Sequence, residues 1–323
     1  MKKYKKILII CLLIIVSMIA IMAIILTRLN TDTQEETEDP GIQFESNQNG
    51  FQIVKDSNVF FSVMNSLSEY IQILSYNRDN AIETDRYRIE SMGQQREAIL
   101  SLLDTTYVNE NDINQENLQV EFIDYSYNII PISMKVRYDQ NMIVYITNIY
   151  IEDIRNSRLE EKYYIIKIDN INKTFCIEPV TDKINSIDDI VVKESKTSIE
   201  KNQYNQYTIE TVSIKNLVKI YMNQFKNMMV KYPDVVYNQY LDEEYKNTHF
   251  PSEKDFLEYV EQNREKIEQW EVTKYSIQGE QDETIYILVD QYENIYRFCE
   301  KGTMDYKVTM DVELTSTENF MDI

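Results

Sequence analysis

The chain has 323 residues, of which 43% are hydrophobic and 27% are charged, a balance typical of a folded protein. Its net charge of −21 at pH 7 disfavours binding to nucleic acid and to anionic lipid headgroups. With only five glycines in the chain, glycine-rich loops that cradle phosphates are excluded, and no cofactor is expected.

The N-terminal segment predicts a membrane anchor. Residues 1–6 contain four lysines, and residues 7–27 form a run of 21 residues without a charge, about 32 Å long as a helix. No small-residue cleavage site follows, so a retained transmembrane helix is favoured over a cleaved signal peptide. The lysines place residues 1–6 in the cytoplasm. The predicted location is therefore the cell membrane, single-pass, with residues 31–323 extracytoplasmic.

Residues 28–50 are polar and acidic and predict a stalk without a core of its own. Beyond residue 28 the chain has 28 basic and 54 acidic residues, a net charge of −26. The remainder divides into a first domain at 51–180, a polar linker at 181–206 and a second domain at 207–323.

The two expected domains share one plan. Apolar residues recur at helical spacing in each, with a constant offset of 154. The two stripes are Phe60, Val63, Met64, Leu67, Ile71 and Leu74, and Ile214, Leu217, Val218, Tyr221, Phe225 and Met228. In the second domain, residues 237–245 are expected to continue as helix, and Ser252 with Asp255 predicts a capped helix that runs to about Trp270.

Strand-like segments follow the helices in both domains. They alternate apolar and polar residues and are rich in Tyr, Ile and Val. The predicted strands are 118–127, 132–139, 142–151, 161–169 and 173–180, then 273–278, 284–290, 295–300 and 304–314. Helices followed by a strand meander predict an α+β fold with helices packed on one face of an antiparallel sheet.

The segments "YIIKIDNINKTFCIEP", "YNQYLDEEYKNTHFPSEKDFLEYVEQN" and "MDYKVTMDVEL" resemble tandem NTF2-like modules of membrane-anchored proteins from Gram-positive bacteria. The resemblance implies two cones, each a curved antiparallel sheet wrapped around helices. The order of one span and two modules also resembles the scaffold proteins of conjugation machines, the VirB8-like and TcpC-like group. Neither group supplies a catalytic motif to transfer to this chain.

The acidic stretch before the only histidine is the first candidate site. Asp242, Glu243 and Glu244 are adjacent on a predicted helix, so they point in different directions, and Glu244 and His249 lack the spacing of metal ligands. A solvated surface is therefore favoured over a metal or acid–base centre. Four neighbours are expected to be buried instead: Tyr240, Leu241, Tyr245 and Phe250.

Other candidate residues also have a structural interpretation. Asp290 or Asp311 could face a cone pocket as an acid–base carboxylate, although aspartates at strand ends more often support turns. Cys176 and Cys299 are expected to be buried apolar residues, and Cys11 lies in the predicted span. The pairs Tyr125/Tyr127 and Tyr145/Tyr150 are interpreted as sheet packing in preference to a ligand platform.

These observations favour a non-enzymatic, membrane-anchored scaffold with no catalytic, cofactor or metal residues. Its expected partners are envelope or membrane proteins, with a possible homo-oligomer, in a conjugation-type or secretion-type assembly. The alternative is a surface module that binds a small ligand or peptide in its cone. A hydrolase or isomerase that uses cone carboxylates is the third hypothesis.

Overall fold

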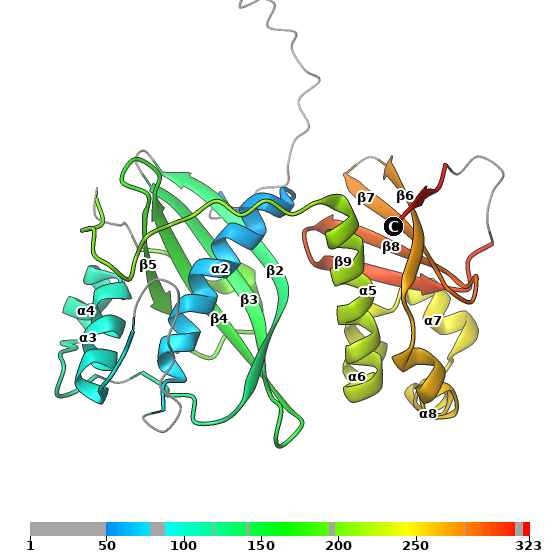
Figure 1. The fold of residues 1–323 in the computed structure, drawn as a ribbon, viewed down its shortest axis with the longest axis horizontal. Coiled ribbons are helices and arrows are strands. Elements are labelled where there is room, and N and C mark those ends of the chain that lie inside the picture. Colours follow the sequence, from blue (N-terminus) through cyan, green and yellow to red (C-terminus); the bar gives the residue numbers. More distant parts are fainter. Residues whose placement is uncertain are drawn as a thin grey trace, which may run out of the picture. The chain divides into compact units, whose positions relative to one another are not determined.

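Two five-stranded antiparallel sheets, each packed against helices, make up the described part of this computed structural model (Figure 1). The structure describes residues 50–77, 88–118, 120–139, 142–193, 198–280, 282–313 and 319–323, all within one compact unit of the chain. The α+β class with antiparallel sheets is confirmed. Residues 50–206 are called the N-terminal half below, and residues 207–323 the C-terminal half.

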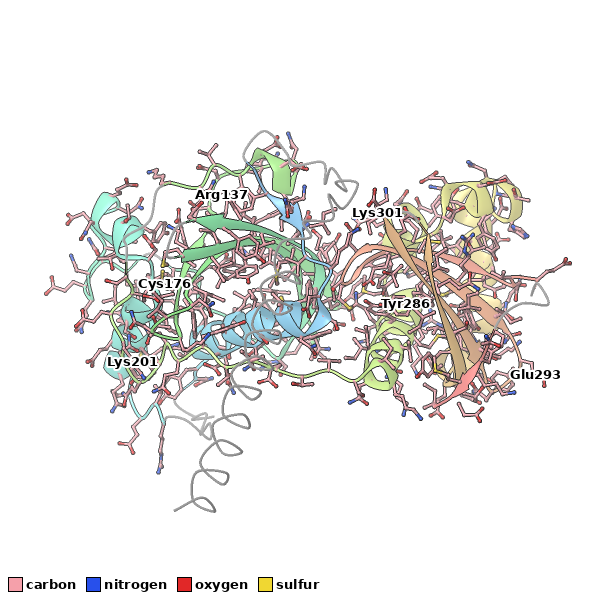
Figure 2. All side chains as sticks on the ribbon, turned by 90° about the horizontal axis from the view of Figure 1, so that it is seen from above. Arg137, Cys176, Lys201, Tyr286, Glu293 and Lys301 are labelled. Carbon is pink, nitrogen blue, oxygen red and sulfur yellow. The ribbon has the colours of Figure 1, made fainter. Side chains whose placement is uncertain are left out.

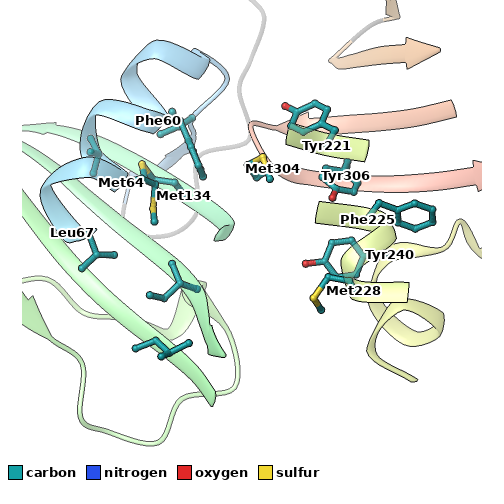
Figure 3. Close-up of a cluster of buried hydrophobic side chains, with 14 of the residues drawn as sticks. Phe60, Met64, Leu67, Met134, Tyr221, Phe225, Met228, Tyr240, Met304 and Tyr306 are labelled. Carbon is teal, nitrogen blue, oxygen red and sulfur yellow. The ribbon is translucent and has the colours of Figure 1, made fainter. Parts of the chain in front are cut away.

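The helices of the N-terminal half are α2 (Ser57–Leu74), α3 (Met92–Leu102) and α4 (Thr105–Glu110). The side-chain oxygens of Asp56, Ser91 and Asp104 accept hydrogen bonds from backbone N–H groups in the first turns of α2, α3 and α4, respectively. All six apolar residues of the first predicted stripe are buried. Helix α2 lies against one face of the sheet, and Figure 3 shows its Met64 beside Met134 of the sheet.

The sheet of the N-terminal half has the order β1-β2-β3-β4-β5. Its strands are β1 (Gln52–Ile53), β2 (Tyr127–Asp139), β3 (Met142–Asp153), β4 (Arg158–Asp169) and β5 (Thr174–Pro179). The predicted strand at 118–127 is wrong, because only its last residue belongs to β2. Its described residues approach the end of α2, where the Ile123 N–H donates to the Leu74 carbonyl at 3.1 Å, and β1 pairs with β2 instead.

Residues after β5 cover the second face of this sheet. Ile190 packs with Phe51 and with sheet residues Val144, Ile146 and Ile165 in a buried cluster, and a short 3-10 turn, η1 (Ile187–Asp189), lies in the same segment. The segment predicted as a polar linker therefore contributes apolar side chains to the N-terminal half.

The C-terminal half repeats this plan with more helices. They are α5 (Ile214–Lys231), α6 (Pro233–Val235), the π-helical turn η2 (Val236–Tyr240), α7 (Glu243–His249) and α8 (Glu253–Glu268). Five residues of the second predicted stripe are buried, and the sixth, Ile214, is 37% exposed. The strands are β6 (Val272–Glu280), β7 (Glu283–Asp290), β8 (Ile295–Gly302), β9 (Asp305–Met310) and β10 (Met321–Asp322), in the order β10-β6-β7-β8-β9.

The helix predicted at 237–245 is interrupted at Leu241. This residue has an extended backbone and forms a bridge with Val308 of β9, so the helix cannot continue through it. Asp242 then caps α7 by accepting from the Tyr245 N–H at 3.0 Å. The predicted capping box at Ser252 and Asp255 is confirmed at the start of α8.

Several hydrogen bonds join the two halves. The backbone of residues 210–212 follows α2, because Ser62 Oγ accepts from the Glu210 N–H at 2.7 Å and Asn58 Oδ1 accepts from the Val212 N–H at 2.8 Å. Lys231 Nζ of α5 donates to Glu152 Oε1 of β3 at 2.8 Å. Polar contacts as well as apolar packing therefore hold the halves in contact.

The predicted membrane helix at residues 7–27, and the single-pass location that depended on it, are not supported by the described part of the chain. No helix in the described part of the chain combines the length and apolarity that crossing a membrane requires. Both 18-residue helices, α2 and α5, carry polar residues on one face, and α5 includes four lysines. Residues 7–27 and nearly all of the predicted stalk lie outside the described residues.

Candidate functional site

The acidic stretch beside His249 does not converge on a site. Glu243, Glu244 and His249 are exposed on α7, and Asp242 serves as its N-cap. His249 Nδ1 lies 3.1 Å from the Tyr245 carbonyl of its own helix, and its ring stacks on Tyr245 at 4.3 Å. Among the described residues, no group of three or more His, Cys, Asp or Glu side chains is placed to hold a metal ion.

The neighbours that were expected to be buried are buried. The exposed fractions of Tyr240, Leu241, Tyr245 and Phe250 range from 0% to 8%. The Phe250 ring packs on Phe256 of α8 at 5.1 Å. This stretch of the chain is therefore part of the helical packing of the C-terminal half.

The candidate aspartates have structural roles or surface positions. Asp290 is 1% exposed, and it accepts hydrogen bonds from the turn at 291–294 and from the Tyr296 hydroxyl at 3.0 Å. Asp311 is exposed and has a positive φ of 55° at the end of β9. Neither residue lines the cavity described below.

A buried charged network lies in the N-terminal half. Lys167 of β4 has a side chain that is 1% exposed, and its ammonium lies 3.3 Å from Asp104 and 3.2 Å from Glu178. The Cys176 thiol donates to Asp104 Oδ2 at 3.4 Å. Burial by itself would raise the pKa of Asp104. The charge of Lys167 and the hydrogen bonds that Asp104 accepts lower this pKa by a larger amount, so it lies below its usual value.

Neither Cys176 nor Cys299 forms a disulfide. Burial, and next the charge of Asp104, raise the pKa of Cys176, so this thiol stays protonated. Cys299 is half-buried. Figure 2 shows Cys176 among the side chains of the N-terminal half, and Cys11 lies outside the described residues.

Aromatic rings fill the space between α5 and the sheet of the C-terminal half. Tyr221 has two ring neighbours at 5.2 Å, Tyr286 and Tyr306, and it also stacks on Phe298. Figure 3 shows Tyr221 and Tyr306 in this cluster. The Tyr221 hydroxyl donates to the carboxylate of Glu300, which is 5% exposed. Burial raises the pKa of Glu300 despite the hydrogen bonds that it accepts.

The N-terminal half contains a cavity of about 560 Å³. The end of α2, the start of α4, residues 120–125, the β3–β4 hairpin and residues 179–184 surround it. The buried residues Tyr70 and Leu74 line one part of the cavity, and charged residues of β4 border it. Its volume falls in the usual range of small-molecule sites.

Tyrosines give this cavity its chemical character. Tyr70, Tyr107, Tyr125, Tyr163 and Tyr164 all line it. Tyr70 and Tyr164 meet edge to face at 6.2 Å, and the buried Tyr70 hydroxyl has no hydrogen-bond partner among the described residues. Burial is the first cause that raises the pKa of both residues, so both hydroxyls stay protonated.

Equivalent helix positions carry different side chains in the two halves. At the 154-residue offset, Leu67 and Ile71 of α2 correspond to Tyr221 and Phe225 of α5. Leu67 and Ile71 are nevertheless fully buried, and neither residue lines the cavity. The same fold plan has an interior packed with aromatic rings in one half and a cavity in the other.

The sequence did not identify the cavity residues. Tyr125 was interpreted as sheet packing, but it precedes β2 and lines the cavity. Tyr145 and Tyr150 do pack on the sheet and are 3% and 6% exposed. The sequence signal for this region was the alternation of apolar and polar residues at 118–127. The described residues of this segment lie beside the end of α2, but they do not form a strand.

No protein-family model, no curated protein and no solved structure matches this chain. The resemblance to tandem NTF2-like modules therefore stays a prediction.

Proposed function

We propose that this chain is a non-enzymatic binding protein whose N-terminal half takes a small organic molecule or a short peptide into its tyrosine-lined cavity. The observation that carries this proposal is the cavity of about 560 Å³, which has buried apolar and aromatic residues on part of its wall and a charged border. Binding sites for small molecules commonly combine these features.

The arrangement of polar groups supports binding in preference to catalysis. The carboxylate of Glu161 accepts from Asn148 Nδ2 and from the Tyr163 hydroxyl, each at 2.8 Å. Asp153 accepts from the backbone and side chain of Asn156 in the hairpin turn. These carboxylates are thus engaged in fixing the walls, while the aromatic surfaces are available for contact.

The filled interior of the C-terminal half suggests a different contribution from that half. Its aromatic residues pack on one another, so any contact with a partner would use its surface. The role as a scaffold for other proteins, and the possible homo-oligomer, stay predictions from the sequence.

A cavity-blocking variant tests the proposed function. Val180 lines the cavity and is half-buried, so Val180→Trp should fill part of it without replacing a fully buried residue. Val191 is 77% exposed and does not line the cavity, so Val191→Trp is a matched control. The wild type and both variants would be screened against neutral, cationic and anionic aromatic compounds and short peptides by thermal denaturation.

Compounds that bind the cavity should raise the melting temperature of the wild type and of Val191→Trp, because they bind only the folded state. The same compounds should lose most of their effect on Val180→Trp. The proposal is overturned if no compound stabilises the wild type, or if Val180→Trp responds as the wild type does.

A further inference from the structure

The border of the cavity carries more negative than positive charge. Its acidic residues are Glu121, Asp153, Glu160, Glu161 and Asp182, and its basic residues are Arg158, Lys162 and Lys183. The whole chain is also acidic, with a net charge of −21. The charges at the border and the net charge of the chain therefore both attract cations to the cavity and repel anions from it.

One lysine already occupies the most acidic part of this border. Lys162 Nζ contacts Glu160 Oε1 at 2.8 Å and also pairs with Glu121, so a single ammonium serves two carboxylates. The side chain of Lys162 is 23% exposed, compared with 69% for Glu121. Burial by itself would lower the pKa of Lys162. Its two carboxylate partners raise this pKa by a larger amount, so the ammonium group stays charged.

Tyrosine rings lie near the same carboxylates. After burial, the charges of Glu121 and Glu160 are the next causes that raise the pKa of Tyr164, and Glu160 has the same effect on Tyr125. Both rings are therefore neutral, and neutral aromatic faces attract ammonium groups. Behind them, Tyr70 lines the cavity with a buried hydroxyl that has no hydrogen-bond partner among the described residues.

We infer that the cavity selects organic cations, with an apolar or aromatic body against the tyrosines and an ammonium group beside Glu121 and Glu160. This inference rests on the proposed function and adds the chemical class of the ligand. In the absence of such a ligand, Lys162 supplies the positive charge that these carboxylates attract. A bound ammonium group competes with Lys162 for them.

Three probes of nearly equal size test this selectivity: naphthylmethylamine, naphthylmethanol and naphthoate, with the same ring attachment. The amine is cationic at pH 7, the alcohol neutral and the carboxylate anionic. Titration calorimetry with the wild type should show the amine binding about fivefold tighter than the alcohol, as expected for one charge near an exposed carboxylate. The naphthoate should bind weakest, and added salt should weaken amine binding alone.

Two substitutions should shift amine affinity in opposite directions. The Glu121→Gln/Glu160→Gln variant should bind the amine about fivefold to tenfold more weakly, because two attracting charges are removed. Lys162→Met should bind it more tightly, because the internal competitor is gone. Neither variant should change the affinity for naphthylmethanol. A gain in affinity cannot result from unfolding, so Lys162→Met keeps the test informative if the double variant is unstable.

The control is Glu265→Gln/Glu268→Gln, which removes the same net charge from exposed positions of α8 in the C-terminal half. Its amine affinity should match the wild type. The inference fails if the alcohol or the naphthoate binds as tightly as the amine, or if the cavity variants leave amine affinity unchanged. If none of the three probes binds and the Val180→Trp screen also finds no ligand, the proposed function itself fails.

Discussion

Lys167 places a positive charge inside the N-terminal half, where only 1% of its side chain is exposed. Its ammonium lies between Asp104 of the α4 N-terminus and Glu178 of β5, so it links a helix to two neighbouring strands. A buried ion pair contributes little beyond the cost of its own desolvation, but removing one partner leaves the other charge uncompensated. The network is thus more sensitive to a single substitution than its net energy suggests.

Substitution Lys167→Met should lower the free energy of unfolding by about 3–5 kcal/mol, because Asp104 loses its countercharge. The exposed control Lys201→Met (Figure 2) should stay within ~0.5 kcal/mol of the wild type. Urea denaturation at pH 7 gives both values. A loss below ~1 kcal/mol in Lys167→Met would show that the charges are solvated in the folded protein.

Lys167→Met should also change how the stability of the protein depends on pH. The pKa of Asp104 is lowered in the folded protein, so its contribution to stability is present above the unfolded aspartate pKa of about 3.9 and is lost as pH falls through the folded value. Without Lys167 this part of the acid sensitivity should disappear.

For Glu300, the pH dependence of stability has the opposite sign. Burial raises the pKa of this carboxyl in the folded protein, so the folded state binds more protons than the unfolded state above the ordinary glutamate pKa of about 4.3. Its contribution to stability is complete below that pH and is lost as pH rises through the folded pKa.

The free energy of unfolding of the wild type, relative to Glu300→Gln, should therefore fall as pH rises from about 4 toward neutral, with a slope of at most ~1.4 kcal/mol per pH unit. Denaturation at a series of pH values measures this difference. Glu265→Gln, at an exposed site on α8, should show no such trend. A flat or rising difference for Glu300→Gln would mean that its carboxyl is not destabilised by burial.

At the scale of elements, the turn between β8 and β9 is fitted to strand β1 of the other half. The Thr303 N–H donates to the Val54 carbonyl at 2.9 Å. A Cβ at Gly302 would lie 2.0 Å from Ile53 Cγ2 and 3.1 Å from the Val54 carbonyl oxygen. This close approach requires glycine for lack of space, since a side chain at Gly302 would push the turn away from β1.

Gly302→Ala should therefore destabilise the protein by about 1–3 kcal/mol in urea denaturation, the usual cost of an added group in a packed contact. The additional substitution Ile53→Ala should recover part of that loss, because it removes the side chain in conflict. Gly279→Ala is the control, since nothing lies within 4 Å of its Cβ position. Equal stabilities of Gly302→Ala and Gly279→Ala would show that the turn and β1 do not approach each other in solution.

At the scale of the whole molecule, residues 181–193 matter more than their composition suggests. Their apolar side chains, including Ile190, cover Phe51 and one face of the sheet of the N-terminal half. A domain that ends at residue 180 would expose this face to water.

We expect a fragment of residues 50–206 to unfold cooperatively, and a fragment of residues 50–180 to be less stable and more prone to aggregation. Thermal denaturation followed by circular dichroism, with light scattering on the same samples, compares the two. Identical melting curves would mean that the segment after β5 adds no stability. A fragment of residues 207–323, measured alongside, tests whether the C-terminal half folds alone.

Local patterns determined most secondary structure. Helical spacing located α2 and α5, alternation located β2 to β9, and the Ser252–Asp255 box located the start of α8, because each of these signals acts within a few residues. The break at Leu241 escaped prediction, since its cause is a backbone bridge to Val308, far along the chain. The segment 118–127 escaped for a similar reason, because its alternation is satisfied by packing against α2.

By itself, the sequence determined the α+β class, the two antiparallel sheets, the repeated helix stripes and the burial of the residues around His249. These follow from periodicity and from the hydrophobic effect, both of which can be read locally. Only the tertiary structure decided that one interior is filled by rings and the other contains a cavity. Tyr70, Tyr125 and Tyr164 meet there from a helix, a loop and a strand, and their convergence depends on the packing of segments that are distant in sequence.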